Sequence, residues 1–168
     1  MRPTPLVLLA FALGSPPGFL LASDREAAKS ALVRTENAFF QHAQIHGFSS
    51  ALNRYITEDG LVANRLTFGP EEPIEKTKSR PTRTLQRWHP ICAEVAAAGD
   101  LGYTWGVAES AATAESTFKP YALYVMIWKR QRDGSWKFVY DAATILPAER
   151  LDTFLRERAR MPLRPPPP

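Results

Sequence analysis

The sequence predicts a single α+β domain in which helices come first and an antiparallel sheet follows. Apolar residues recur at helical spacing between residues 23 and 47. Between residues 85 and 141 they recur at every second position, as in β-strands. Turn signals containing glycine divide this second part into strands. Because the strands follow one another without intervening helices, we expect an antiparallel meander and not a βαβ arrangement. Such a sheet, strongly curved, can wrap around the N-terminal helix and leave a cone-shaped cavity.

The N-terminal helix is predicted from a capping box and a helical repeat. In "SDRE", residues 23–26, the Ser23 hydroxyl can accept a hydrogen bond from the third helical N–H while Glu26 reaches back. The repeat then continues to Gly47, which is placed as a C-cap. A short second helix, "SSALNRYI", is expected to start at Ser49 or Ser50.

A turn and a polar region separate the helices from the long strands. "TEDG", residues 57–60, predicts a turn, after which a short strand begins at Leu61. Residues 64–84 are polar and interrupted by prolines, which indicates a flap with a short helix around "EEPIEKTKS".

The remaining strands are joined by two recognisable turns. "WHPICAEVAAAG" and "LGYTWGVAES" are connected at Gly99-Asp100, and "FKPYALYVMIWKRQ" meets the final strand "WKFVYD" through Asp133-Gly134. Alternation places Trp136, Phe138 and Tyr140 on one side of that final strand and Asp141 on the other. We expect the strand to end at Asp141. On the preceding strand Tyr121, Leu123, Val125 and Ile127 share one face, opposite Tyr124, Met126 and Trp128.

Both ends of the chain fall outside the predicted domain, residues 23–145. Residues 1–22 carry a positive Arg2 and the apolar run "PLVLLAFAL", which together are typical of an export signal. The segment is too short and too interrupted by proline to span a membrane, so we expect a periplasmic or secreted protein. A retained membrane tether is the alternative. Residues 146–168 predict a helix that opens at Pro147, followed by a proline-rich tail.

Composition narrows the classes of function. A chain of 168 residues suits one domain, and its net charge of +4 is scattered, so no nucleic-acid partner is expected. Cys92 is the only cysteine, which rules out an internal disulfide and a thiolate metal cluster. His42 and His46 have the spacing of metal ligands on a helix, but no third ligand is evident. The sequence therefore predicts no metal and no cofactor.

Three motifs together resemble a known superfamily. They are "WHP" at residues 88–90, "AAGDLGYTWG" at 97–106 and "YALYVMIWKRQRDGSWKFVYD" at 121–141. The chain from Ser23 to Asp141 resembles nuclear transport factor 2-like proteins, and within them the SnoaL-like and ketosteroid-isomerase-like branch. The resemblance implies a cystatin-like, cone-shaped antiparallel sheet around the N-terminal helix, a conical pocket and homodimers formed through the sheet. Members of that branch include isomerases, dehydratases, polyketide cyclases and ligand binders, so the site must decide the function.

Asp141 is the first candidate for a catalytic acid or base. The resemblance aligns it with the branch's acidic residue at a strand end, and burial would raise its pKa. A ligand contact and a structural carboxylate are the alternative roles. His89, held extended by Pro90, is the second candidate, as a base at the pocket mouth. Glu36, on the first helix with Phe39, could face the cavity, but a solvated side chain is the expected case. The predicted ligand-binding residues are aromatic: Phe39, Tyr55, Trp88, Tyr103, Trp105, Tyr121 and Tyr140.

These observations predict an exported protein that binds a small hydrophobic molecule in a conical pocket. A more specific form of this hypothesis is an isomerase or lyase that works by proton transfer without a cofactor. The alternative is a dimerising interaction module with a vestigial pocket, whose C-terminal helix and proline tail recruit a partner. The first hypothesis requires a cavity of roughly 300 Å³ or more that Asp141 reaches.

Overall fold

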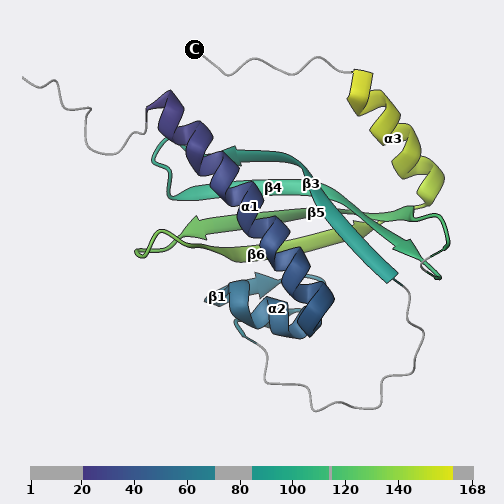
Figure 1. Ribbon diagram of the computed structural model, residues 1–168, viewed down its shortest axis with the longest axis horizontal. Coiled ribbons are helices and arrows are strands. Elements are labelled where there is room, and N and C mark those ends of the chain that lie inside the picture. The colour runs from purple at the N-terminus through teal and green to yellow at the C-terminus, as the bar shows by residue number, and fades with distance from the viewer. Residues whose placement is uncertain (1–20, 71–84, 114, 161–168) are drawn as a thin grey trace, which may run out of the picture.

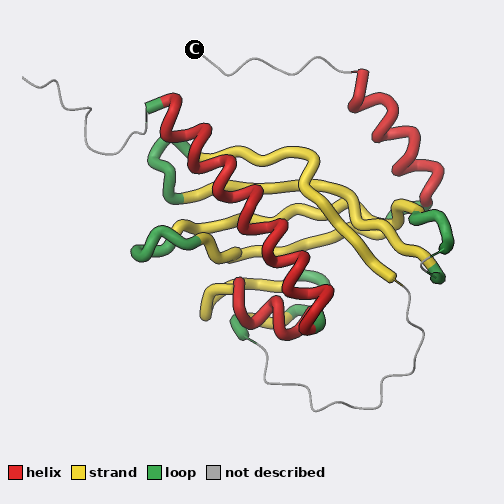
Figure 2. The backbone as a smooth tube through the Cα atoms, in the orientation of Figure 1, coloured by secondary structure: helices red, strands yellow, loops and turns green. Residues whose placement is uncertain are grey.

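The computed structural model describes residues 21–70, 85–113 and 115–160, and in it a long helix lies across one face of a six-stranded sheet (Figure 1). The elements are α1 (Ala22–His46), α2 (Phe48–Tyr55), β1 (Ile56–Val62), β2 (Thr67–Phe68), β3 (Leu85–Val95), β4 (Leu101–Ala111), β5 (Lys119–Arg130), β6 (Trp136–Ile145) and α3 (Ala148–Arg160). Figure 2 shows α1 lying across one face of a curved, open sheet. The predicted α+β class, with a sheet curved around the N-terminal helix, is confirmed.

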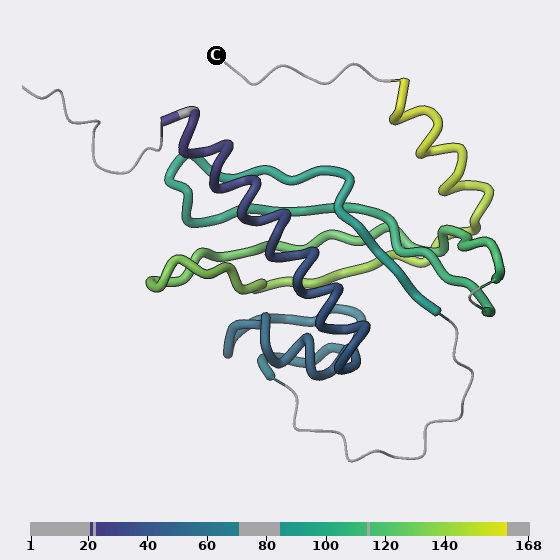
Figure 3. Tube along the Cα trace, viewed as in Figure 1, coloured from purple at the N-terminus to yellow at the C-terminus, as the bar shows by residue number. Residues whose placement is uncertain are grey.

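The sheet is not a pure meander. Its strand order is β2-β1-β6-β5-β4-β3, and β1 pairs with β6 in parallel while the other neighbouring pairs are antiparallel. Figure 3 shows this pair as two colours from distant parts of the chain lying side by side. The sequence prediction missed the parallel pair because β1 reaches the sheet from α2 and not through a hairpin.

The predicted capping box is wrong. Helix α1 begins two residues earlier than predicted, with Leu21 in place of Ser23 as its N-cap and no side-chain cap. The extended backbone of Leu21 lets its carbonyl accept a bond from the Arg25 N–H at 3.0 Å, so Ser23 already lies inside the helix. Gly47 ends α1 as predicted, with a φ of 88° that favours glycine. Gly47 is also the N-cap of α2, and this is why α2 starts at Phe48 and not at Ser49 or Ser50.

The predicted turn at "TEDG" is also wrong. These residues belong to β1, which runs from Ile56 to Val62 and is irregular along β6 between Ile56 and Leu61. Gly60 permits this close approach, because a Cβ there would lie 2.6 Å from the Ile56 side chain and 3.1 Å from the Phe138 carbonyl oxygen. The polar region that follows contains the two-residue strand β2.

Strand β6 continues past Asp141 to Ile145, contrary to the prediction, because β5 offers pairing partners as far as Ala122. It also carries a β-bulge: Ile127 pairs with Tyr140 and Trp128 with Phe138, which leaves Val139 unpaired. One extra residue reverses the alternation beyond it. Asp141 therefore shares the face of Phe138, and Tyr140 lies on the opposite face, the reverse of the predicted arrangement.

The hydrophobic core lies between α1 and the face of the sheet that α1 covers, here called the inner face. Buried residues of α1, α2 and the strands β1, β3, β5 and β6 meet there, among them Leu32, Phe39, Leu52, Met126, Trp128 and Phe138. Gly102 brings α1 close, because a Cβ at this position would lie 2.7 Å from Cδ2 of Leu32. The Trp128 indole N–H donates to the Thr104 hydroxyl at 2.9 Å, which satisfies both buried polar groups.

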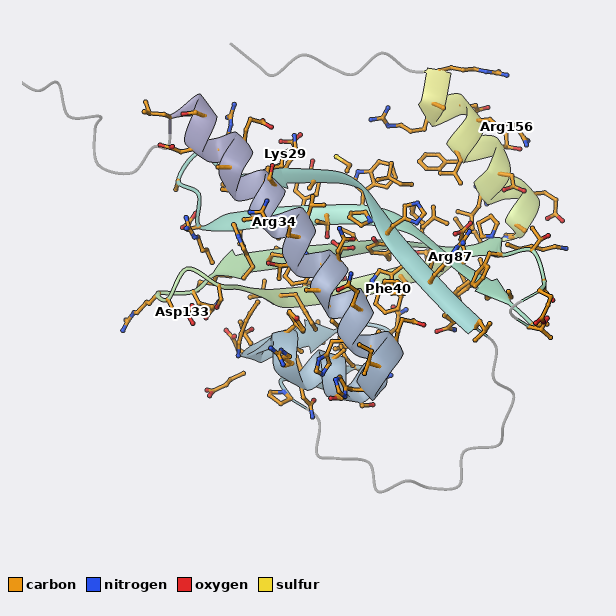
Figure 4. All side chains as sticks on the ribbon, in the orientation of Figure 1. Lys29, Arg34, Phe40, Arg87, Asp133 and Arg156 are labelled. Carbon is orange, nitrogen blue, oxygen red and sulfur yellow. The ribbon has the colours of Figure 1, made fainter. Side chains whose placement is uncertain are left out.

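The opposite, outer face of the sheet is partly covered by α3. The Phe154 ring of α3 lies 6.0 Å from the Trp105 ring of β4, and Leu151 is fully buried. This helix follows Pro147, as predicted, and Figure 4 shows Arg156 on it, far from Asp133 at the tip of the β5–β6 hairpin. Gly134 in that hairpin has the positive φ, 84°, that its turn requires.

Several predictions fall outside the described residues. They are the export signal apart from residues 21 and 22, the helix expected around residues 71–79, and the proline-rich tail beyond residue 160. Within the part of the chain that the structure describes, none of the helices combines the length and the apolar character needed to cross a membrane.

Candidate functional site

A cavity of about 320 Å³ opens between the end of α1, the end of β1 and the inner face of β3–β6. This volume is within the range of small-molecule sites. Its walls are mostly aromatic and apolar, and its polar groups are few. The lining residues are Phe39, Phe48, Val62, Asn64, Arg65, Gln86, Trp88, Ala108, Tyr121, Tyr124, Met126, Asp141 and Ala143.

Asp141 reaches this cavity from the middle of the sheet. It pairs with Val62 on β1 and Met126 on β5, both of which line the cavity. Its backbone carbonyl accepts a bond from the Ala63 N–H at 2.8 Å, and the Asn64 side chain accepts one from the Ala143 N–H at 3.2 Å. The two bonds hold the residues after β1 against β6, at the edge of the cavity.

Burial raises the pKa of the Asp141 carboxyl from 3.8 to about 6, and the nearby Arg65 guanidinium offsets only part of this effect. A carboxyl group with such a pKa changes protonation state close to neutral pH. It can therefore both accept and return a proton under ordinary conditions.

A second carboxyl group lies beneath the cavity. Glu36 on α1 is fully buried, and its Oε1 accepts a hydrogen bond from the Tyr124 hydroxyl at 2.5 Å. Its Oε2 has no partner of hydrogen-bond geometry among the described residues, although the Thr104 hydroxyl is near enough to favour ionisation. Burial raises the pKa of Glu36, and the negative charge of Asp141 raises it further. The expectation of a solvated Glu36 is wrong.

Tyr124 lies near both carboxyl groups and is hydrogen-bonded to Glu36. Burial, followed by the charges of Glu36 and Asp141, raises the pKa of the Tyr124 hydroxyl, so this group keeps its proton. Gly106, its partner on β4, makes room for the ring, because a Cβ there would lie 2.7 Å from the Tyr124 hydroxyl and would overlap the His89 carbonyl oxygen. Glu36, Tyr124 and Asp141 thus lie close together, with Tyr124 and Asp141 in the cavity lining and Glu36 behind them.

The structure brings together four of the nine predicted site residues: Phe39, Trp88, Tyr121 and Asp141 all line the cavity. Tyr121 does so from a second irregular position, since Ala108 pairs with Ala122 while Glu109 pairs with Pro120. Tyr55 lies outside the lining and packs in the core, with its ring 5.6 Å from that of Phe39.

The other four predicted residues lie on the outer face. His89 pairs with Val107, Tyr103 with Ile127 and Trp105 with Val125, and Tyr140 lies beyond the bulge. Residues that pair across neighbouring strands lie on the same face of the sheet. The residues next to them in sequence, Trp88, Thr104 and Met126, lie on the opposite face, the one that α1 covers. None of the four lines the cavity. His89 is exposed on the outer face and is therefore not placed to act as a base at the pocket mouth.

Sequence reasoning missed Tyr124, Phe48, Asn64, Arg65 and Gln86 as lining residues. Tyr124 could have been found if the face of β5 that carries Met126 and Trp128 had been assigned to the cavity.

His42 and His46 have ring centroids 4.4 Å apart, and His42 Nε2 bonds to the Ser50 hydroxyl at 3.1 Å. The described residues contain no group of three side chains suited to a metal ion.

Comparisons with known proteins match the architecture. No family model and no curated protein matches the sequence. A cystatin-like protein from Caulobacter vibrioides is 15% identical and has a TM-score of 0.53 over 79% of this chain and 99% of its own. A protein from Catenulispora acidiphila is 12% identical, with a TM-score of 0.56 over 78% of this chain and 99% of its own. A nuclear transport factor 2-like protein from Novosphingobium aromaticivorans is 17% identical, with a TM-score of 0.51 over 77% and 92%.

The chain therefore has the cystatin-like fold of nuclear transport factor 2-like proteins, as the sequence motifs implied. At these identities the likeness establishes the fold, and the activity has to be argued from the cavity.

Proposed function

We propose that the protein binds a small, mostly apolar molecule in this cavity and exchanges a proton with it through Asp141. Such chemistry would make it an isomerase or lyase of the SnoaL-like, ketosteroid-isomerase-like kind that needs no cofactor. The observation that supports the proposal most is the position of Asp141, a carboxyl group of pKa about 6 inside an aromatic cavity. We also propose that the protein acts outside the cytoplasm, on the basis of the apolar sequence in residues 1–22.

The arrangement suits proton transfer in two ways. The apolar walls formed by Phe39, Trp88 and Met126 would shield a bound molecule from part of the solvent. The pKa of Asp141, about 6, lies close to neutral pH, and an acid or base is most efficient when its pKa is near the operating pH.

Asp141→Asn tests the proposal directly. A panel of steroids, polyketides and small aromatic acids is screened by thermal shift, and any ligand is then tested as a substrate. A ligand present at 100 times its dissociation constant is expected to stabilise the protein by about 2.7 kcal/mol. The variant is expected to retain binding and to lose turnover.

Asp152→Asn, the same change at an exposed site on α3, serves as the control and should retain both properties. Turnover that survives Asp141→Asn would exclude Asp141 as the acid or base. A panel without a single stabilising ligand would count against the cavity as a binding site.

A second candidate function is homodimerisation through the sheet. The outer face of β4–β6 presents apolar side chains that α3 covers only in part, and Tyr103 remains 42% exposed there. Apolar surface that remains partly accessible is typical of protein interfaces. The other members of this face are Trp105, Val125, Ile127 and Tyr140.

Sedimentation velocity is expected to show a dimer for the wild-type chain and a monomer for Tyr103→Arg, because the new charge would be buried at the interface. Phe68→Arg is the matched control, since Phe68 is 71% exposed on β2, at the far edge of the sheet. A wild-type chain that sediments as a monomer would exclude this interface.

A further inference from the structure

Two histidines at the end of α1 lie in the arrangement of a pair of metal ligands. His42 and His46 are four residues apart, so both side chains project from the same side of the helix. Their ring centroids are 4.4 Å apart. We propose that the two imidazoles together bind one divalent first-row transition-metal ion, such as Cu²⁺ or Ni²⁺, with water in the remaining coordination positions.

The distance between the two rings suits a shared metal ion. Imidazole nitrogens bind Zn²⁺ and similar ions at about 2.0–2.1 Å, so two nitrogens on one ion are about 3 Å apart. Rings with centroids 4.4 Å apart can each present one nitrogen at that separation by side-chain rotation alone. Because the last turn of α1 already holds the two side chains next to each other, binding requires little reorganisation.

The surroundings of His42 orient its ring, and those of His46 admit solvent. His42 is half-buried, its Nε2 shares a hydrogen bond with the Ser50 hydroxyl of α2 at 3.1 Å, and its ring lies 6.3 Å from that of Tyr55. Figure 1 shows α2 beside this end of α1. An imidazole has two nitrogens, so Ser50 can orient the ring through one and leave the other for the metal, as is usual for ligand histidines. His46 is exposed, so water can reach the bound ion.

The donor atoms determine the class of metal. Imidazole nitrogen suits Cu²⁺, Ni²⁺ and Zn²⁺, whereas Mg²⁺ and Ca²⁺ prefer oxygen ligands. Within the described ranges, no third His, Cys, Asp or Glu side chain joins the pair. The affinities should therefore follow the intrinsic order of the ions, in which Cu²⁺ exceeds Ni²⁺ and Zn²⁺. Neither histidine lines the cavity, so the metal site is independent of the function proposed above.

The positive charge of Arg54 on α2 opposes metal binding, because it is near enough to act on His42. Arg54 is exposed, so solvent weakens the repulsion. Arg54→Gln is accordingly expected to bind Ni²⁺ about threefold more tightly than the wild type, as suits the removal of a screened surface charge. A weaker affinity in this variant would place the ion elsewhere.

Isothermal titration calorimetry of the full chain, prepared without an affinity tag, tests the proposal with Cu²⁺, Ni²⁺ and Mg²⁺ as probes. We expect one ion per chain, with Cu²⁺ bound more tightly than Ni²⁺ and no binding of Mg²⁺. His46→Ala should weaken Ni²⁺ binding at least about tenfold, since even groups that only orient a ligand are worth that much. Because His46 is exposed, its removal should leave the fold intact. His42→Ala should have the same effect.

His89→Ala is the matched control, because His89 is the third histidine of the chain and is exposed on the outer face of the sheet. This variant should bind Ni²⁺ as the wild type does. Unchanged affinity in His46→Ala, or an equal loss in His89→Ala, would overturn the proposal. So would the absence of saturable Ni²⁺ binding up to about 1 mM, which corresponds to a very weak site.

NMR provides a second readout that does not depend on any variant. Ni²⁺ is paramagnetic, so a small amount of it should broaden the imidazole signals of His42 and His46 together and leave those of His89 sharp. Broadening of His89 to the same extent, or of one member of the pair alone, would contradict a shared site.

Discussion

Asp141→Asn is expected to stabilise the folded protein by about 3 kcal/mol at neutral pH. The folded-state pKa of Asp141, about 6, lies above the ordinary value of 3.8, and this difference corresponds to the stated free energy. Because the folded state binds the proton more tightly, the stabilising contribution is present below pH 3.8 and is lost as the pH rises through about 6. An asparagine side chain of nearly the same shape carries no charge and avoids that loss.

Urea unfolding at pH 4 and at pH 7.5 measures this effect. The variant and the wild type should differ little at pH 4, and the variant should be more stable at pH 7.5. Asp152→Asn is exposed on α3 and should change the free energy of unfolding by less than about 0.5 kcal/mol at either pH. Equal effects of Asp141→Asn at the two pH values would show that the Asp141 carboxylate is not destabilised by burial.

Phe39→Ala is expected to reduce the free energy of unfolding by about 3–5 kcal/mol. Phe39 is 2% exposed, and its ring contacts those of five other residues at centroid distances of 5.5 to 6.5 Å. These residues are Phe48, Tyr55, Trp88, Trp128 and Phe138. Removing the ring would leave a space between α1 and the sheet that the surrounding elements cannot fill.

The neighbouring Phe40→Ala provides the comparison, again by urea unfolding. Phe40, labelled in Figure 4, is only partly buried, and its ring lies 4.8 Å from that of Trp88. We expect Phe40→Ala to reduce the free energy of unfolding by clearly less than Phe39→Ala does. Equal losses would contradict the view that Phe39 is the centre of the core.

The long elements could be predicted because their local signals agree with the fold. The Asp133-Gly134 and Gly99-Asp100 turns place β3–β6 correctly, since positive φ values at Gly99 and Gly134 are requirements of the backbone itself. The choice of face could not be made in the same way. Both sides of β5 are apolar, so alternation alone does not tell whether Tyr124 or Val125 lies under α1.

The candidate site was predicted only in part because it depends on irregularities of the sheet. Alternation assumes an unbroken ladder, and the single extra residue Val139 was enough to exchange the sides of Tyr140 and Asp141. Glu36 did carry a usable signal. It follows Leu32 by four residues and precedes Phe39 by three, the spacing of the buried helix face. An acidic residue at such a position is a reason to look for a buried polar cluster.

The parallel pairing of β1 with β6 has a consequence for the order of folding. The β5–β6 hairpin needs only a short loop to close, whereas Asn64 and Ala143, which hold the edge of the cavity, are 79 residues apart in the chain. Contacts of such long range form late, after local ones have reduced the cost of loop closure. We therefore expect Asp141 to stay in contact with water until the final step of folding, so that the unfavourable burial of its charge is imposed only when the rest of the domain is already assembled.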